Sequence, residues 1–420
     1  MLDLKFIREN IDIINTNIKN KLAEVDLSRF AELDEKRRSV IQEVEKLKNQ
    51  RNVVSKEIAE LKKSKQSADD KIASMKEVSD NIKSMDDDLR LVDEEIKSLQ
   101  MSVPNMCHSS VPVGRSESDN KIVSTWGEAK TQPLKKAHMD IARDLDIIDF
   151  ERGAKVSGNG FSFYKGKAAK LERALISFMI DYHTDNHGYT EVFPPFLVNR
   201  ESMYGTGQLP KMADDMYHAT EDDMYLIPTA EVPITNFHAG EMLDVKSLPI
   251  KYCGYSPCFR REAGSYGKEV RGLLRVHQFN KVEMVNFALP EESYNLLEKL
   301  TSEAEDILKA LGLHYRKLLL CTGDTSFSSA KTYDLEVWSP GEEKWLEVSS
   351  CSNFEDFQAR RANIRFKREA GAKPEFIHTL NGSGLATSRI MVALLENYLT
   401  AEGNVEIPEV LKDYTKFDLI

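Results

Sequence analysis

Basic, acidic and aromatic side chains are concentrated between Phe259 and Glu283, in the stretch FRREAGSYGKEVRGLLRVHQFNKVE. The pattern predicts a strand ending at Glu262, a long basic loop, and a second strand. Glycines in the loop allow backbone angles that other residues resist, and alternate residues of the second strand share one face of a sheet. The glycines are Gly264, Gly267 and Gly272, and the residues sharing a face are Arg275, His277, Phe279, Lys281 and Glu283.

The residue types of this hairpin suit a nucleoside triphosphate together with a small amine. Arginine clamps phosphate oxygens with a planar fork, and the ring of Phe279 can stack on a base. The carboxylate of Glu283 can hold an ammonium group. On these residues alone, a hairpin whose exposed face is simply charged is an equal alternative, because charge runs usually face solvent.

Two further segments carry oxygen ligands. In IPTAE (227–231), a strand would place Thr229 and Glu231 on one face, as a small-ligand site requires. Taken alone, a helix start is the favoured interpretation, because Thr-x-Glu often begins a helix. In KWLEVSS (344–350), Glu347 and Ser350 could ligate a divalent cation that bridges phosphates, since hard cations prefer oxygen. Polar residues 352–361 then lead into a basic strand.

The stretch LNGSGLATSR (380–389) precedes an apolar helix that we expect over residues 390–399. Its glycines would let the backbone approach a ligand, and Arg389, in the first turns of the helix, could reach a triphosphate. A lone Gly-x-Gly is a weak signal. Together with Arg389 and the upstream hairpin it indicates a nucleotide site much more strongly.

Two stretches with a heptad pattern dominate the first hundred residues. Their apolar residues step by threes, fours and sevens on either side of the polar break KKSKQSADD, which predicts an antiparallel coiled-coil hairpin over residues 28–100. About thirty residues per helix give an arm of ~45 Å. The apolar positions are Leu33, Val40, Val44, Leu47, Val54, Ile58 and Leu61, then Ile72, Met75, Ile82, Met85, Leu89, Val92, Ile96 and Leu99.

The two predicted helices differ in charge. Residues 33–62 carry eight Lys/Arg against six Asp/Glu, and residues 69–100 carry five against ten. The basic helix could lie along an RNA backbone, although a dimerisation or spacer coil is favoured for the arm alone. Pro104 ends the arm, and irregular sequence follows to residue 135. We therefore expect an N-terminal domain over residues 1–105 and a second domain over residues 106–420.

Composition narrows the class of protein. The 420 residues, 41% apolar and 30% charged, fit a soluble globular chain of two or three domains, and no run of 18 apolar residues predicts a membrane span. The start MLDLKFIREN is too polar for a signal peptide. The five scattered cysteines predict reduced thiols in a cytoplasmic protein, without a zinc site. The net charge of −11 argues against bulk nucleic-acid binding but allows a local basic surface.

In combination, these motifs resemble the seryl-tRNA synthetases, a family of class II aminoacyl-tRNA synthetases. Three class motifs occur in order, near residues 188–196, 259–283 and 380–395. The resemblance extends over essentially the whole chain. The residues that match are Gly188, Tyr189, Val192 and Pro195 in the first motif, Phe259, Arg260, Glu262, Arg275, Phe279 and Glu283 in the second, and Gly382, Gly384 and Arg389 in the third.

The resemblance implies an α+β catalytic domain with an antiparallel sheet flanked by helices, an N-terminal tRNA-binding coiled-coil arm, and a homodimer formed through the first motif. It implies that serine and ATP give seryl-adenylate and pyrophosphate, and that serine is then transferred to the 3′-terminal adenosine of tRNA(Ser). The same family charges tRNA(Sec) with serine. ATP and Mg²⁺ are the expected cofactors.

Residue roles also follow from the resemblance. Arg260, Glu347 and Arg389 would be catalytic, and Glu347 with Ser350 would hold Mg²⁺. The ATP-binding residues would be Arg260, Arg261, Glu262, Phe279, Glu347, Val348, Ser349, Ser350 and Arg389. The serine-binding residues would be Thr229, Ala230, Glu231, Arg260, Glu283, Asn381 and Ser383.

Two positions depart from the family pattern. Ser388 stands where the third motif usually has an acidic residue or a glycine, and Phe354 stands where the family often has a smaller residue. Two other functions remain to be weighed: an adenylating enzyme that loads a carrier protein, and a tRNA-binding scaffold with an inactive synthetase domain. The long arm, with its heptads and basic first helix, disfavours the first. The presence of Arg260, Glu262, Glu283, Glu347 and Arg389 disfavours the second.

Overall fold

The computed structural model describes residues 1–263 and 272–420, and the chain forms two compact units. The smaller comprises residues 2–19 and 23–104, and the larger comprises Met1, residues 20–22 and residues 105–420. Gly264 and Gly267 of the predicted loop lie outside the described residues. In the part of the chain that is described, no helix is both long and apolar enough to span a bilayer.

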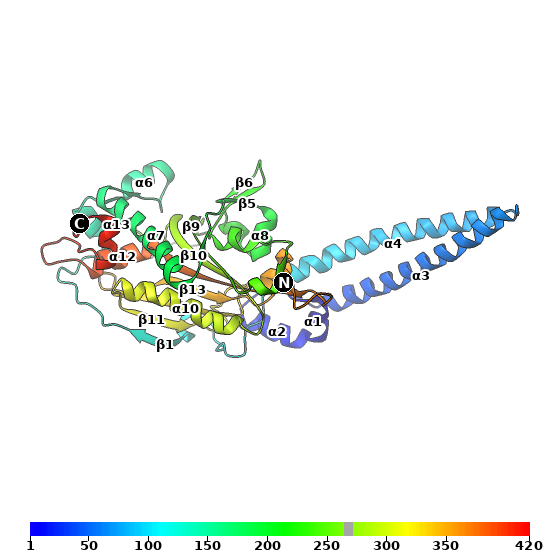
Figure 1. The fold of residues 1–420 in the computed structure, drawn as a ribbon, viewed down its shortest axis with the longest axis horizontal. Coiled ribbons are helices and arrows are strands. Elements are labelled where there is room, and N and C mark those ends of the chain that lie inside the picture. The colour runs from blue at the N-terminus through cyan, green and yellow to red at the C-terminus, as the bar shows by residue number, and fades with distance from the viewer. Residues whose placement is uncertain (264–271) are drawn as a thin grey trace. The chain divides into compact units, whose positions relative to one another are not determined.

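The smaller unit contains a long helical hairpin (Figure 1). Its two helices have 34 residues each. In the ion pairs between them, residues later in the first helix pair with residues earlier in the second, as antiparallel helices require. Arg37 pairs with Asp93 at 2.6 Å, and Lys48 pairs with Asp86 at 3.2 Å. The predicted antiparallel coiled-coil hairpin is therefore confirmed. The helices of the N-terminal region are α1 (Leu4–Glu9), α2 (Ile11–Asn20), α3 (Phe30–Lys63) and α4 (Asp69–Ser102).

The hairpin seam follows the heptads of α4 with one correction. Ile82, Val92 and Ile96 are buried as the spacing predicts. Ile72, however, is 42% exposed, and Val78, which the predicted set omitted, is buried instead. Val78 lies four residues before Ile82 and so continues the alternation of threes and fours, whereas Ile72 lies three residues before Met75 and would break that alternation.

The larger unit is organised around an eight-stranded sheet with the strand order β1-β11-β12-β13-β16-β10-β9-β4. All neighbouring pairs are antiparallel except β4 and β9, which are parallel. This confirms the α+β class with an antiparallel sheet. The strands are β1 (Lys121–Trp126), β4 (Thr190–Glu191), β9 (Ile250–Phe259), β10 (Gln278–Ala288), β11 (Tyr315–Leu319), β12 (Lys331–Ser339), β13 (Lys344–Asn353) and β16 (His378–Ala386).

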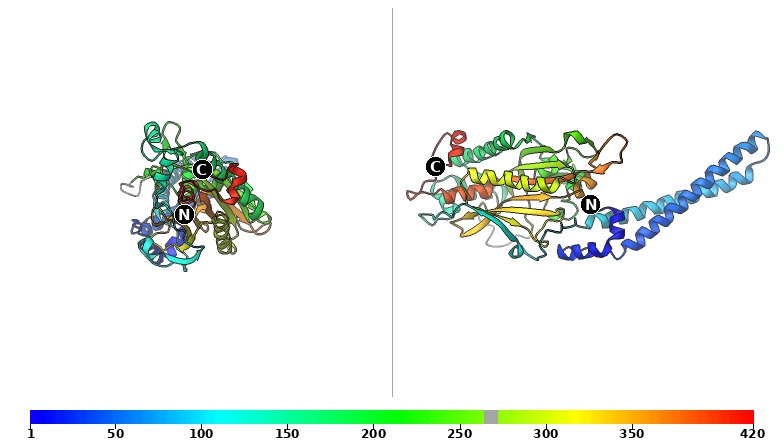
Figure 2. Two further views of the ribbon diagram at one scale, coloured as in Figure 1. Left: turned by 90° about the vertical axis from the view of Figure 1, so that its left-hand side faces the viewer. Right: turned by 60° about the horizontal axis from the view of Figure 1, so that its bottom comes forward.

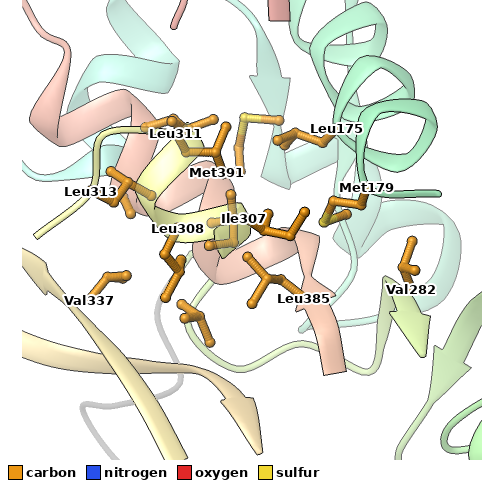
Figure 3. Packing of buried hydrophobic residues seen from close by; sticks show 14 of the residues in the cluster. Leu175, Met179, Val282, Ile307, Leu308, Leu311, Leu313, Val337, Leu385 and Met391 are labelled. Atoms are coloured by element: carbon orange, nitrogen blue, oxygen red, sulfur yellow. The ribbon is translucent and has the colours of Figure 1, made fainter. Parts of the chain in front are cut away.

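Helices α7 (Gly166–His187), α10 (Ser293–Ala310) and α12 (Thr387–Asn397) pack on one face of this sheet (Figures 1 and 2). Met179, Ile307 and Met391, one from each helix, join Val282 and Leu385 of the sheet in the main apolar core (Figure 3). Because this core fixes the central strands from behind, their opposite face is available to hold a site.

The residues of strand β10 alternate between the two faces of the sheet, and those on the face opposite the main core fall into an apolar part and a polar part. Val282 and Met284 enter the main core, while Val285 and Phe287 pack in a second core with helices α9 (Glu231–Asn236) and α11 (Phe357–Ala362). Strand alternation places three earlier residues of β10 on the same face as Val285 and Phe287, and these three are polar or aromatic. They are Phe279, Lys281 and Glu283.

The remaining elements surround this framework. Three small sheets have the orders β15-β14-β8, β2-β3 and β5-β7-β6. The strands are β2 (Ile148–Asp149), β3 (Phe163–Tyr164), β5 (Leu197–Asn199), β6 (His218–Ala219), β7 (Met224–Leu226), β8 (Met242–Asp244), β14 (Arg365–Lys367) and β15 (Glu375–Phe376). The helices are α5 (His138–Asp144), α6 (Phe150–Ser157), α8 (Arg200–Thr206) and α13 (Glu409–Thr415), with 3₁₀ turns at Glu117–Asp119, Ala213–Asp215 and Val245–Ser247.

Several predicted boundaries were wrong. Strand β9 ends at Phe259, three residues before Glu262, and β10 begins at Gln278, so Arg275 and His277 precede it. Glu262 has a positive φ of 51°, which a continuing strand does not tolerate. Polar residues 356–361 form most of helix α11 before the short basic strand β14.

The glycines of the third motif also serve a different purpose from the one predicted. A Cβ on Gly382 would lie 2.3 Å from Leu300 of α10, and a Cβ on Gly384 would lie 2.6 Å from His183 of α7. They therefore allow β16 to pack closely on the helices behind the sheet and do not face a ligand. Asn381 and Ser383, on the alternate positions, face the other way and line a cavity.

Candidate active site

The face of the sheet opposite α7, α10 and α12 holds a cavity of about 460 Å³. Its lining comes from the residues that follow β9, from the start of β10, from β13 and β16, from the start of α12 and from neighbouring loops. Most residues of the predicted site line it. They are Thr229, Glu231, Arg260, Glu262, Phe279, Glu347, Val348, Ser349, Ser350, Asn381, Ser383 and Arg389.

Three residues of the predicted site do not line this cavity. Ala230 is buried in the second core, and Arg261 is exposed, with its main-chain N–H donating to the carbonyl of Asp215. Glu283 is fully buried behind Lys281, whose Nζ lies 2.5 Å from its Oε2. Glu283 therefore acts on the cavity through its neighbours.

Two carboxylates, those of Glu231 and Glu283, form an acidic group at one end of the site. Gln358 donates to Glu231 Oε1 at 2.6 Å, and Asn381 donates to Glu283 Oε1 at 2.7 Å. Burial, followed by the charge of Glu283, raises the pKa of Glu231 to about 7. A cation placed here would be attracted by both carboxylates.

Thr229 and Glu231 lie at the start of α9, not on a strand. The main-chain N–H of Glu231 donates to Thr229 Oγ1 at 3.1 Å. The helix-start interpretation of this segment was therefore right. Both side chains nonetheless line the cavity, so a hydroxyl and a carboxylate are presented together.

Arg260 is held by its main chain and by a ring. Its N–H donates to the carbonyl of His277 at 3.0 Å, and His277 Nδ1 donates to the carbonyl of Arg260 at 2.9 Å. The guanidinium lies 5.2 Å from the centroid of the Phe279 ring. The pairing of β9 with β10 thus continues past the last strand residues and fixes a cation beside an aromatic face.

Arg389 and Glu347 form a second charged group. Arg389 donates to the carbonyl of Glu347 at 2.7 Å and to that of Leu274 at 3.2 Å, and its NH1 lies 3.4 Å from Glu347 Oε2. The third residue of α12 is thereby fixed between β13 and the segment that leads into β10. An arginine so placed can receive phosphate oxygens.

A β-bulge explains how Glu347 and Ser350 reach the same cavity. Residues three apart on a regular strand point to opposite faces. In β13, however, Ser349 lies opposite Leu335 and Glu347 lies opposite Glu336, so Val348 is an extra residue. The bulge turns the chain between them, as bulges commonly do beside active sites.

Asp334 was missed by the sequence prediction. It lies opposite Ser350 in the β12–β13 pairing. Burial and the charge of Glu347 hold the pKa of Asp334 well above its usual range. Lys281 and Gln358 were also not assigned to the site. Lys281 could have been found because it shares the β10 alternation with Phe279, whereas no local signal marks Gln358.

One other cluster has metal-ligand side chains, among the residues described. His138 Nδ1 lies 3.1 Å from Glu342 Oε1 and 3.5 Å from Glu396 Oε1. His138 Nε2, however, accepts the main-chain N–H of Leu273 at 3.2 Å. A neutral imidazole that accepts at Nε2 carries its proton on Nδ1, so it faces the carboxylates as a donor. The cluster anchors the chain before Leu274 and does not suit a metal ion.

The antiparallel sheet, the arginine at the end of β9 and the arginine at the start of α12 define a class II aminoacyl-tRNA synthetase core. A family profile agrees: the tRNA synthetase class II core domain (G, H, P, S and T) matches residues 215–398. The seryl-tRNA synthetase N-terminal domain matches residues 1–107.

Individual relatives narrow the assignment. The serine–tRNA ligase of Chlorobium phaeovibrioides is 58% identical over 429 residues, which cover 100% of this chain and 99% of the relative. The seryl-tRNA synthetase of Pyrococcus horikoshii, solved in complex with ATP, has a TM-score of 0.93 and 38% identity, covering 100% of this chain and 99% of that one. The cytoplasmic serine–tRNA ligase of Naegleria fowleri, solved in complex with AMP, has a TM-score of 0.88 and 32% identity, covering 100% of this chain and 98% of that one. The chain belongs to the seryl-tRNA synthetase family and is a serine–tRNA ligase.

Proposed function

We propose that the cavity activates L-serine with ATP and that the seryl group then passes to the 3′-terminal adenosine of tRNA(Ser). The observation that carries this proposal is the meeting of two groups in one cavity. Arg260, Phe279 and Arg389 suit a nucleotide, and Glu231 with Asn381 suits a small amino acid. The ATP complex of the P. horikoshii relative supports the choice of nucleotide.

In the activation step, a carboxylate oxygen of serine attacks the α-phosphorus, and the bond from that phosphorus to the pyrophosphate oxygen breaks. No general base is required, because the serine carboxylate is already ionised at neutral pH. Arg260 would stabilise the charge that develops on the α-phosphate. Phe279 would stack on adenine, and Arg389 would hold the far end of the triphosphate. Alignment of the two substrates supplies the remaining rate.

Serine selection follows from the buried polar groups. Glu231 would receive the serine ammonium, and the buried charge of Glu283 would add to the attraction. Thr229 and Ser383 would lie beside the serine hydroxyl. A pocket built to bond a hydroxyl rejects alanine strongly, because alanine leaves those groups unpaired. Threonine would be rejected mainly because its extra methyl group does not fit the pocket, which is a weaker discrimination.

The oxygen ligands near β13 fit Mg²⁺. Glu347 and Ser350 line the cavity, and the raised pKa of Asp334 marks a place where negative charge is crowded and a cation would relieve it. We propose that Glu347 and Ser350 hold the ion. When bound, it would neutralise phosphate charge as a Lewis acid.

The arm is proposed to bind tRNA. The match of residues 1–107 to the N-terminal domain of the family supports this role. Arg51 and Lys56 of α3, which have no acidic partner within 4 Å among the described residues, would contact phosphates. We extend the proposal to tRNA(Sec), which the same arm would receive.

The protein is proposed to act as a cytoplasmic homodimer. Apolar side chains are exposed beside the edge strand β4: Phe193 is 75% exposed and Phe237 is 61% exposed. Phe193 also contacts the rings of Phe196 and Tyr255. A second copy would cover this apolar surface. Light scattering of Phe193→Asp beside the unaltered protein would test it, with dissociation expected.

The function is tested by serine-dependent ATP–pyrophosphate exchange, run beside charging of tRNA(Ser) with labelled serine. Exchange with charging supports the proposal, and charging of a separate tRNA(Sec) transcript supports its extension. Exchange without charging would favour a carrier-loading enzyme. Folded protein with neither activity in the presence of Mg²⁺ would favour an inactive tRNA-binding scaffold.

A further inference from the structure

The segment 326–329 (SFSS) lies between β11 and β12, outside any helix or strand. Ser326, Phe327 and Ser328 line the catalytic cavity. A segment without ladder hydrogen bonds keeps its place only if other groups bind its main chain. The identity of those groups is therefore informative.

Each of the four main-chain carbonyls of this segment accepts a hydrogen bond from one of two residues outside the segment, Lys21 and Asn105. Lys21 Nζ donates to the carbonyls of Ser326 and Ser329, both at 2.7 Å. The main-chain N–H of Asn105 donates to the carbonyl of Phe327 at 2.9 Å, and Asn105 Nδ2 donates to that of Ser328 at 2.9 Å. With its carbonyls held in this way, the segment keeps residues 326–328 in the lining of the cavity.

Both residues are buried, with Lys21 8% and Asn105 3% exposed. Burial of an ammonium group against neutral carbonyls is costly, and it lowers the pKa of Lys21 to about 8. Asn105 Nδ2 also donates to the carbonyl of Phe354 at 2.8 Å, and Phe354 lines the cavity as well. If these two positions only filled space in the core, apolar side chains would be more stabilising there. The side-chain donors of Lys21 and Asn105 therefore indicate a positioning role.

The same two residues mark where the chain leaves and re-enters the larger unit. Lys21 follows α2, and Asn105 follows Pro104, after α3 and α4. We propose that Lys21 and Asn105 are positioning residues that hold segment 326–329 as a wall of the substrate cavity. The two points at which residues 23–104 join the larger unit would then set the geometry of the amino-acid site. This inference rests on the proposed function of the cavity.

The position of Ser328 indicates which substrate is affected. A Cβ on Gly207 would lie only 3.3 Å from Ser328 Cβ, so the two segments are in contact. The neighbouring carbonyl of Thr206 accepts from Gln358 Nε2, which also donates to Glu231 Oε1. The wall therefore adjoins the acidic group that would bind the serine ammonium. Loosening it should weaken serine binding more than ATP binding.

The test uses full-length Asn105→Ala and Lys21→Met, each of which keeps the fold's apolar contacts and removes donors. We expect each to raise the KM for serine in pyrophosphate exchange on the order of tenfold, as the loss of two buried hydrogen bonds implies. The KM for ATP should change less than about twofold. Lys21→Arg, which keeps the donors, should restore most of the loss.

Asn397→Ala is the matched control. Asn397 Nδ2 also donates to two main-chain carbonyls, those of Trp338 and Ala393, and it does not line the cavity. We expect no change in either KM. An unchanged serine KM in Asn105→Ala and Lys21→Met would overturn the inference, as would equal changes in both KM values. Absence of serine-dependent exchange in the unaltered protein would instead overturn the proposed function.

Discussion

The helical arm and the catalytic cavity both rely on ion pairs, but in different surroundings. In the arm, Lys48 and Asp86 are 44% and 46% exposed, so water screens their attraction. At the cavity, the lining residue Lys281 is 7% exposed, and its partner Glu283, which lies behind it, is fully buried. Exposed pairs cost little and contribute little, whereas a buried pair is retained against a desolvation penalty. The arm therefore carries charge for a partner, and the cavity carries charge for chemistry.

Arg260→Ala should have the largest effect on either side of this comparison. Removing one preorganised donor that stabilises transition-state charge costs about 10²–10³-fold in rate, and the half-buried guanidinium of Arg260 would supply several donors. We expect serine-dependent pyrophosphate exchange to fall at least about 10³-fold. Circular dichroism should remain unchanged. Near-normal exchange would remove Arg260 from the mechanism.

Deleting residues 36–98, with a short glycine–serine turn in their place, separates the two regions directly. Exchange should stay within about twofold, because the cavity is lined by residues outside the arm. Charging of tRNA(Ser) should fall by about 10²-fold at physiological salt, as expected when several phosphate contacts are lost. Equal charging by the shortened and full-length proteins would show that the arm does not hold the tRNA.

Lys281→Met and Arg37→Met compare a buried pair with an exposed one. Lys281→Met leaves Glu283 buried without its cation and should lower the free energy of unfolding by about 3 kcal/mol. Arg37→Met should change it by less than about 1 kcal/mol, because Arg37 and Asp93 are both accessible to water. Urea unfolding of the two variants provides the measurement. Equal losses would contradict the distinction drawn between the regions.

Glu231→Gln should reveal a pH dependence that belongs to the cavity. Because the folded protein raises the pKa of Glu231 from 4.5 to about 7, it binds this proton more tightly than the unfolded chain does. Stability is therefore lost as pH rises from about 4.5 through 7. The glutamine variant should escape this loss and exceed the parent by about 2–3 kcal/mol at pH 8, but by much less at pH 5. Urea unfolding of the parent and the variant at pH 5 and pH 8 would measure this. The same difference in the free energy of unfolding at both pH values would contradict the prediction.

Val78→Ala and Ile72→Ala should give the smallest effects and distinguish two neighbouring arm positions. Val78 is buried in the seam, so its truncation should cost about 1 kcal/mol. Ile72 is exposed, and its truncation should stay within about 0.5 kcal/mol. Hydrogen exchange of the α4 amides in the full-length protein measures both. A larger effect at Ile72 would place it in the seam after all.

Sequence alone predicted what repeats locally. The heptads of α4 gave the coiled coil because the period can be counted, and Arg389 was placed in the first turns of its helix because an apolar run follows it. Features that depend on a partner strand were not predicted. The bulge at Val348 appears only in the pairing of β13 with β12.

The same limit explains the errors at glycine and at the cavity wall. Gly382 and Gly384 were expected to face a ligand because a sequence does not show which side of a strand a helix covers. Asn105 looked like the end of a helical arm, and its hydrogen bonds to residues 327 and 328 join positions more than two hundred residues apart. Long-range contacts of this kind leave no periodic signal.

The pairing of α3 with α4 also limits how the length of the arm can change. A residue inserted into one helix alone turns every following side chain by about 100°, which removes apolar residues from the seam. A tolerated change adds or removes about seven residues in each helix together and alters the reach by ~10 Å. The arm can therefore differ among relatives only in discrete steps, and any change in its reach should appear as matched insertions or deletions on both sides of residues 64–68.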